Sequence, residues 1–274
     1  MKRLIACTLL ALAGCATTTP SPHASIPAGS RYVAMGSSYA AGAGIGPLVP
    51  DSPTRCGRTV NNYAHLLAAR LRLDLADVSC GGAVTANILA PWNELPAQID
   101  AVTADARLVT VTIGGNDVNF VRDLFVTLCT RKDADAGRPC RSMAEPSEAL
   151  WSTLEQRLRE IAREVKRRAP GARLIFVDYL KVIPDDSLCD AIPLGAEQAA
   201  RSRRTFSRLA AVTAKVAKEE GAELLPAGAL SSGHEACSPQ PWAVGSPVKE
   251  GSPWHPTAAG HATIADELAG RLAK

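Results

Sequence analysis

The chain has 274 residues, 46% of them apolar, which is enough to bury one sizeable core and requires no more than a single domain. Its formal charge of +3 falls to +1 if the segment that contains Lys2 and Arg3 is removed. A nearly neutral chain offers no electrostatic basis for binding nucleic acid, so we expect no such partner.

The N-terminus has the features of an export signal. Lys2 and Arg3 precede an apolar run over 4–14 that is too short to span a bilayer stably. The run ends in Leu-Ala-Gly-Cys at 12–15, which resembles the lipobox of bacterial lipoproteins. By that resemblance Cys15 becomes the diacylated first residue of the mature protein. The alternative is an ordinary secretory signal with a chance cysteine.

Two boundaries follow from this interpretation. Residues 1–14 form the signal peptide, and 15–29, polar and interrupted by proline, form a tether between the lipidated Cys15 and a folded domain at 30–274. Ala16 at the second mature position resembles the pattern that permits transfer to the outer membrane in hosts with two membranes. We therefore expect an exported protein, anchored by lipid to the cell envelope on its periplasmic or extracellular side.

Strand patterns and helix patterns alternate along the folded domain. Strands are predicted at 31–35, 75–79, 108–113, 173–179 and 222–225, and helices at 60–71, 146–169, 198–220 and 256–272. Leu150, Leu154, Leu158 and Ile161 recur at helical spacing and predict the buried face of the helix at 146–169. The alternation favours an α/β fold with a parallel sheet between two helix layers, in which functional groups collect at the carboxyl ends of the strands.

The cysteine content also indicates export. After Cys7 leaves with the signal and Cys15 is lipidated, six remain: Cys56, Cys80, Cys129, Cys140, Cys189 and Cys237. An even number in an exported protein favours disulfides, but six cysteines allow 15 connectivities. A metal site is the competing interpretation, yet His234 and Cys237 have no second close pair to complete a ligand set. We expect no metal and no cofactor.

Four short segments carry residues suited to acyl transfer. Ser38 lies on a glycine turn directly after the first strand, where the free N–H groups of a helical turn favour negative charge. Gly82 lies in a turn that lets a backbone N–H approach a substrate closely. Asn116, in the Gly-Gly-Asn-Asp segment after the central strand, offers an amide donor. His255 precedes Pro256, which suits the first position of the terminal helix and leaves His255 at its cap.

The order, spacing and types of these residues resemble the SGNH (GDSL) hydrolases over essentially the whole mature chain, and the Gly-Gly-Asn-Asp segment is the most specific match. Tyr39 after the serine, the six cysteines and the Trp-His-Pro segment are similar to the secreted bacterial esterases and lipases of this family. The resemblance implies a three-layer α/β/α sandwich with a flavodoxin-like parallel sheet. It also implies three sequential disulfides: Cys56–Cys80, Cys129–Cys140 and Cys189–Cys237.

The resemblance assigns roles to the same residues. It implies that Ser38 is the nucleophile and His255 the general base, because a serine hydroxyl attacks poorly until a base takes its proton. Gly82, Asn116 and the backbone N–H of Ser38 are implied to form the oxyanion hole.

Two positions depart from the family pattern. Ser37 stands where the family usually has an Asp before the nucleophile, which makes Ser37 a rival nucleophile placed behind Ser38. Ser252 stands where the family usually has the Asp that orients the histidine. We therefore predict a Ser38–His255 dyad in which the backbone carbonyl of Ser252 accepts the histidine N–H. Glu250, the only nearby acid, is the alternative group for that role.

The function expected from sequence is hydrolysis of carboxylic esters, with lipid or short-to-medium acyl esters as substrates and a monomeric enzyme without cofactor. One alternative is removal of O-acetyl groups from envelope polysaccharide. Another, motivated by Ser37 and Ser252, is a binding protein that keeps the fold and has lost turnover. Asp117 is expected to cap a turn, and Trp254 either to line the acyl site or to pack.

Overall fold

The computed structural model describes residues 25–126, 143–248 and 251–273. The predicted signal peptide, the lipidated Cys15 and most of the tether lie outside these residues. So do Glu250 and the predicted Cys129–Cys140 pair.

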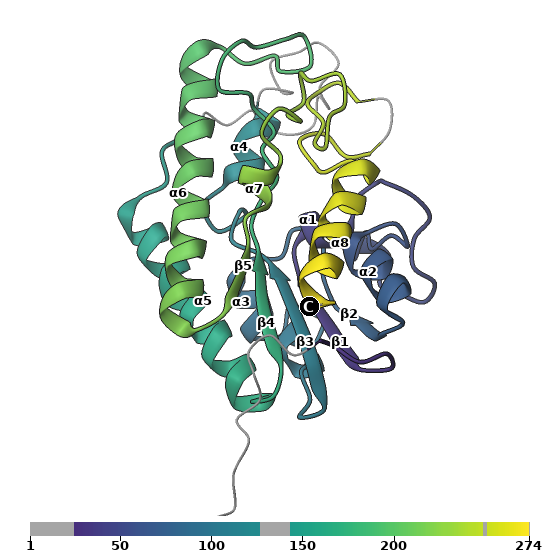
Figure 1. The fold of residues 1–274 in the computed structure, drawn as a ribbon. Helices are drawn as coiled ribbons and strands as arrows, with labels where there is room; N and C mark the ends of the chain where they lie inside the picture. Colours follow the sequence, from purple (N-terminus) through teal and green to yellow (C-terminus); the bar gives the residue numbers. More distant parts are fainter. Residues whose placement is uncertain (1–24, 127–142, 249–250, 274) are drawn as a thin grey trace, which may run out of the picture.

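Five parallel strands form one sheet in the order β2-β1-β3-β4-β5 (Figure 1). The strands are β1 Arg31–Gly36, β2 Asp74–Asp77, β3 Ala106–Thr112, β4 Arg173–Val177 and β5 Glu223–Leu225. β3 lies at the centre, and all but one of its seven residues are buried, because helices cover both faces. The parallel sheet and flavodoxin-like strand order predicted from sequence are confirmed.

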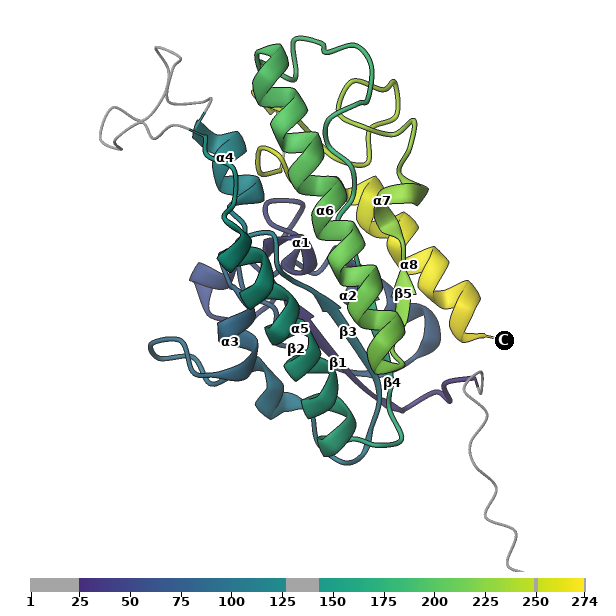
Figure 2. The same cartoon turned by 90° about the vertical axis from the view of Figure 1, so that its left-hand side faces the viewer.

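Helices pack on both faces of the sheet. They are α1 Ser38–Ala41, α2 Tyr63–Leu71, α3 Thr85–Leu89, α4 Phe120–Val126, α5 Glu148–Arg168, α6 Ala196–Glu220, α7 Ala227–Leu230 and α8 Ala258–Leu272, with 3₁₀ turns η1 Thr54–Cys56 and η2 Gln98–Ala101. α3, α5 and α6 lie on one face, in front of the strands in Figure 2, and α2 packs against α8 on the other. α1 and α4 lie beyond the end of the sheet where the strands finish (Figure 1).

The buried face of α5 differs by one residue from the sequence prediction. Leu154, Leu158 and Ile161 are fully buried as expected, but Leu150 is 38% exposed and Trp151 takes its place in the core. Leu150 lies in the first turn, where its N–H bonds to the oxygen of the N-cap Ser147. Leu150 and Trp151 are adjacent apolar residues in the same turn, and the structure buries the tryptophan and leaves the leucine partly exposed.

Two disulfides tie long loops to the body of the domain. Cys56–Cys80 joins the loop after α1 to the turn after β2, and Cys189–Cys237 joins the loops that follow β4 and α7. These are the two implied pairs that lie within the described residues. In the same part of the chain, no helix combines the length and apolarity needed to cross a membrane.

The packing of α5 can be tested with two leucines of the same helix. Leu158→Ala should lower the free energy of unfolding by about 2–5 kcal/mol, because the cavity forms in a core that cannot collapse fully. Leu150→Ala is the matched control and should cost less than about 1 kcal/mol. Urea denaturation followed by circular dichroism measures both. Equal losses would show that the two positions are equally buried in solution.

Candidate active site

Ser38 is the first residue of α1, directly beyond the carboxyl end of β1. β1 ends at Gly36, whose φ of 148° and close approach to β3 exclude a side chain, since a Cβ there would lie 2.4 Å from the carbonyl oxygen of Thr112. Gln98 holds this end of the strand by bonding both backbone groups of Gly36, at 2.7 Å and 3.0 Å. The chain therefore turns sharply from strand to helix and presents Ser38, half-buried, at the edge of the sheet.

The hydroxyl of Ser38 meets the imidazole of His255 across 217 residues of sequence. Ser38 Oγ lies 2.7 Å from His255 Nε2. The neighbouring Ser37 is 1% exposed, and its Oγ lies 3.3 Å from the hydroxyl of Tyr179 instead. Of the two serines on the turn, only Ser38 has a hydrogen bond to the histidine.

A backbone carbonyl orients His255, but the predicted residue is wrong. His255 Nδ1 lies 2.7 Å from the carbonyl oxygen of Pro253. The acceptor is therefore Pro253 and not Ser252. Trp254 between them has a φ of 65°, a left-handed conformation that turns the Pro253 carbonyl back toward the histidine ring. Because a carbonyl can only accept, Nδ1 carries the proton and Nε2 presents its lone pair to Ser38.

The start of the terminal helix also differs from the prediction. Thr257, whose side chain accepts from the N–H of Gly260, is the N-cap of α8, so His255 does not occupy the cap. His255 instead lies in an extended segment, where its carbonyl accepts from Val244 and the next residue, Pro256, forms an antiparallel bridge with Ala243. This pairing holds the backbone of His255 beside residues 243–244.

Tyr39 contacts both the histidine ring and the backbone that precedes it, a role that sequence reasoning missed. Its hydroxyl donates to the carbonyl of Trp254 at 2.5 Å, and its ring centre lies 5.1 Å from that of His255. Trp254 is fully buried, so it packs in the core and does not line an acyl site. On its other side Tyr39 packs against Tyr179, with 4.5 Å between ring centres. Tyr179 lies 140 residues away, and no sequence pattern indicates the contact.

Polar contacts join the turns that carry Gly82 and Asn116. The side-chain nitrogen of Asn116 donates to the carbonyl of Ala83 at 2.9 Å, which orients the amide and leaves its second N–H for another acceptor. Asp117 accepts from the backbone N–H of Thr85 at 3.0 Å and from its hydroxyl, and so caps the start of α3 as expected. Gly82 has a φ of 81°, which favours glycine.

Three N–H donors are thus available at this edge of the sheet. Within the described residues, the backbone N–H groups of Ser38 and Gly82 have no protein acceptor. The Gly82 turn is held next to β1 because Cys80 donates to the carbonyl of Gly36 at 3.0 Å and forms the disulfide with Cys56. With the remaining N–H of Asn116, these donors are of the kind that stabilises a developing oxyanion.

Burial keeps His255 neutral. It lowers the pKa of His255 to about 4, and the hydrogen bond to Pro253 only partly offsets this effect. The ring is therefore unprotonated at neutral pH and can accept a proton from Ser38. His261 on α8 is also buried, which lowers its pKa to about 3, and its Nδ1 accepts from the backbone N–H of Tyr63. His261 is a structural residue.

The described residues contain no group of three or more His, Cys, Asp or Glu side chains suited to hold a metal ion. His234 lies on a loop, stacked on Trp242 with 3.9 Å between ring centres, and Cys237 is bonded to Cys189.

The model of the GDSL-like lipase/acylhydrolase family matches residues 34–263. The chain belongs to this family. As a GDSL-like acylhydrolase it is a serine ester hydrolase with an α/β sandwich fold.

Its relatives include Lipase 2 of Streptomyces coelicolor, 32% identical over 86% of this chain and 83% of that protein. The crystal structure of an extracellular lipase from Streptomyces rimosus has a TM-score of 0.73 at 28% identity, over 88% of this chain and 99% of that one. The structure of a phospholipase A1 from Streptomyces albidoflavus has a TM-score of 0.72 at 28% identity, over 89% and 100% of the two chains.

The two buried histidines predict how pH acts on the folded acylhydrolase. Between about pH 6.5 and 4 the unfolded chain binds more protons than the folded one, so the free energy of unfolding should fall as pH is lowered. Each of His255 and His261 removes up to about 1.4 kcal/mol per pH unit in this range. An NMR titration of the imidazoles, combined with urea denaturation at each pH, measures both quantities. A His255 ring that titrates near 6.5 would contradict its burial as a neutral base.

Proposed function

We propose that Ser38 and His255 form the catalytic dyad of this acylhydrolase, and that the substrates are lipid or short-to-medium acyl esters. The observation that carries the assignment is the 2.7 Å contact between Ser38 Oγ and His255 Nε2, with the histidine tautomer fixed by Pro253. The substrate class is supported by the relatives, which are named as lipases and a phospholipase A1.

In the first step Ser38 Oγ attacks the ester carbonyl carbon while His255 Nε2 takes the hydroxyl proton. The tetrahedral intermediate then collapses, the bond to the alcohol breaks, and His255 returns the proton to the leaving alkoxide. An acyl-enzyme on Ser38 and a free alcohol result.

Charge develops on the former carbonyl oxygen during this step. We assign the backbone N–H groups of Ser38 and Gly82 and the side-chain N–H of Asn116 as its donors. Ser38 is at the N-terminus of a helical turn, and Asn116 is already oriented by its bond to Ala83. Preorganised donors of this kind need no rearrangement as the charge forms, and the loss of one costs about 10²–10³ in kcat.

In the second step a water molecule takes the place of the alcohol. His255 removes its proton as the water oxygen attacks the acyl carbon, and the proton then passes to Ser38 Oγ as the acyl–serine bond breaks. The products are the carboxylic acid and the free enzyme.

Matched serine variants test the assignment. Ser38→Ala and His255→Ala should each lower kcat by about 10³ or more, because they remove the nucleophile or the base. Ser37→Ala is the control and should retain substantial activity, since Ser37 is buried against Tyr179. The assay is hydrolysis of p-nitrophenyl esters of graded chain length. An inactive Ser37→Ala with an active Ser38→Ala would reverse the assignment.

The same ester series separates the alternative functions. Activity on acetyl esters alone, with release of acetate from envelope polysaccharide, would identify an O-acetyl esterase. A wild-type protein that binds ligands but hydrolyses no ester and does not react with a fluorophosphonate would be a binding protein. The Ser38–His255 hydrogen bond argues against a binding protein without activity.

We also propose that the protein is exported and anchored by a lipid on Cys15. The disulfides suit an oxidising compartment, and the Streptomyces rimosus relative is an extracellular lipase.

The anchor predicts the behaviour of a single variant. Cys15→Ser should abolish acylation, because serine has no thiol to carry the diacylglycerol. The activity should then move from the membrane fraction to the soluble fraction. Metabolic labelling with a fatty acid and fractionation of cells measure this, with Cys7→Ser as the control in the segment that is removed. Unchanged membrane association of Cys15→Ser would contradict the anchor.

A further inference from the structure

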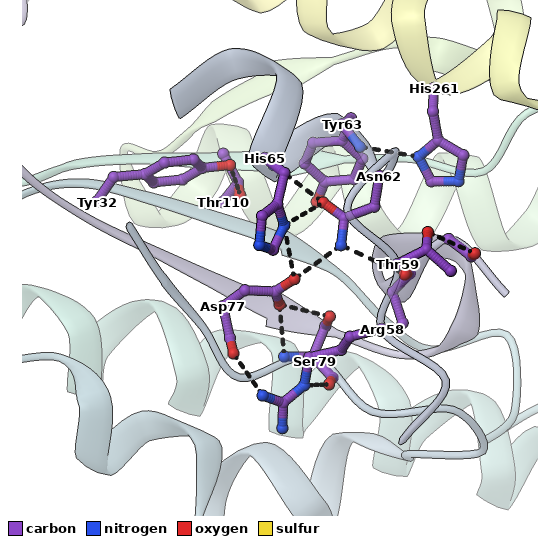
Figure 3. A network of polar contacts seen from close by, with 12 residues as sticks. Tyr32, Arg58, Thr59, Asn62, Tyr63, His65, Asp77, Ser79, Thr110 and His261 are labelled. Carbon is purple, nitrogen blue, oxygen red and sulfur yellow. Dashed lines mark hydrogen bonds and ion pairs between the residues drawn. The ribbon is translucent and has the colours of Figure 1, made fainter. Parts of the chain in front are cut away.

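A buried carboxylate, Asp77, ends β2, the strand beside β1, and takes no part in the proposed chemistry. Its side chain is only 4% exposed. Figure 3 shows polar side chains that converge on it from the loop before α2, from α2 itself and from the turn after β2. The two carboxylate oxygens have different hydrogen-bond partners: Asn62 bonds Oδ2, and Ser79 bonds Oδ1.

One oxygen leads to the helix that carries Ser38. Asp77 Oδ2 accepts from the side-chain nitrogen of Asn62 at 2.7 Å, and the same nitrogen donates to the carbonyl of Ala41, the last residue of α1. Thr59 bonds the same end of α1, because its N–H donates to Ala41 and its hydroxyl to Gly42, each at 2.9 Å. The segment 59–62 therefore holds the end of a helix that is only four residues long.

The contact between this segment and α1 is close. A Cβ on Gly42 would lie 2.6 Å from the hydroxyl oxygen of Thr59 and 2.8 Å from the Cβ of Asn62. α1 has no side-chain N-cap of its own, since Ser37 bonds Tyr179 instead. A displacement of the 59–62 segment would thus move α1 and Ser38 with it.

The other oxygen leads to the turn that carries Gly82. Asp77 Oδ1 accepts from the N–H of Ser79 at 3.0 Å and from its hydroxyl at 2.6 Å. Arg58 reinforces the same corner, donating to the backbone carbonyls of Ser79 at 2.6 Å and Asp77 at 2.8 Å. Ser79 is fully buried and directly precedes Cys80, so its position sets the start of the Gly82 turn.

We propose that Asp77 is a positioning residue, which fixes the helix of the nucleophile relative to the oxyanion turn by bonding Asn62 with one oxygen and Ser79 with the other. This inference rests on the proposed roles of Ser38 and Gly82. The two groups must keep their separation to within a fraction of an ångström, because a misplacement of about 1 Å can cost 10²-fold in rate.

Asp77→Asn tests the link while keeping the size of the side chain. An amide has one acceptor oxygen and one donor nitrogen, so a donor must then face either Asn62 or Ser79. We expect kcat to fall by about tenfold with KM changed less than about twofold, because the reacting groups shift while the ester still binds. Asp74→Asn, on the same strand but exposed and paired with Arg31, is the matched control and should leave both constants unchanged.

A core variant separates positioning from stability. Leu158→Ala destabilises the domain through a buried side chain of α5 and changes no polar contact of Asp77. We expect Leu158→Ala to keep kcat within about twofold of the wild type when it is assayed below its melting temperature. A fall in kcat for Leu158→Ala as large as that for Asp77→Asn would overturn the proposal. So would a kcat for Asp77→Asn equal to that of Asp74→Asn.

All variants are assayed as the full chain, well below their melting temperatures, beside Ser38→Ala. If Asp77→Asn does not fold, Ser79→Ala decides, since it removes only one bond to the carboxylate: a fall of about threefold in kcat supports the link, and an unchanged kcat refutes it. A Ser38→Ala that keeps its activity would refute the proposed function itself. An inactive Ser38→Ala beside a fully active Asp77→Asn would refute only the positioning role.

Discussion

The active site depends on a neutral hydrogen bond, between Nδ1 of His255 and the carbonyl of Pro253. Among the described residues, this carbonyl and Ser38 Oγ are the two hydrogen-bond partners of the imidazole. A carboxylate in place of the carbonyl would fix the same tautomer and also stabilise the imidazolium that forms during proton transfer. A carbonyl fixes the tautomer but contributes only a dipole. Burial lowers the pKa of the ring to about 4, and the bond to Pro253 offsets this only in part. In the proposed mechanism the imidazolium is therefore stabilised in the transition state by other groups, including the developing oxyanion.

A carbonyl acceptor also changes what must be held in place. A side-chain carboxylate can adjust its rotamer, whereas the direction of a backbone carbonyl follows from the torsions on either side of it. Here those torsions are unusual, because Trp254 has a left-handed φ. Its conformation is held by complete burial of the side chain, by the hydrogen bond from Tyr39 and by the pairing of the next two residues with the strand-like segment at 243–244. Tyr39 is thus a second determinant of histidine geometry, through its bond to Trp254 and its ring contact with His255.

The sequence predicts the order of strands and helices well, because the apolar periodicity and the Gly and Pro breaks are local properties. It also predicts that Ser38 and Asn116 lie at one edge, since the carboxyl ends of parallel strands meet there. Three features escape it for physical reasons. Pro253 depends on one positive φ at a residue that is not glycine. The contact of Ser37 with Tyr179 joins segments 142 residues apart. Leu150 fits the helical pattern, yet the adjacent Trp151 is buried in its place, and periodicity does not decide between two neighbouring apolar residues.

The two halves of the site are held by different means. The histidine half depends on backbone torsions and aromatic packing, whereas the oxyanion half depends on buried carboxylates that bond to its turns. Asp117 ties the turn of Asn116 to the start of α3. Burial raises its pKa, and the hydrogen bonds from Thr85 and the nearby Arg157 oppose that rise. Within the described residues, neither Asp77 nor Asp117 is a hydrogen-bond partner of His255. A negative charge placed beside the imidazole would raise the pKa of His255, and part of the base would then be protonated at neutral pH. With its pKa lowered to about 4, His255 is unprotonated at neutral pH and can accept a proton, and in the proposed arrangement separate side chains, Asp77 and Asp117, hold the turns of the oxyanion donors.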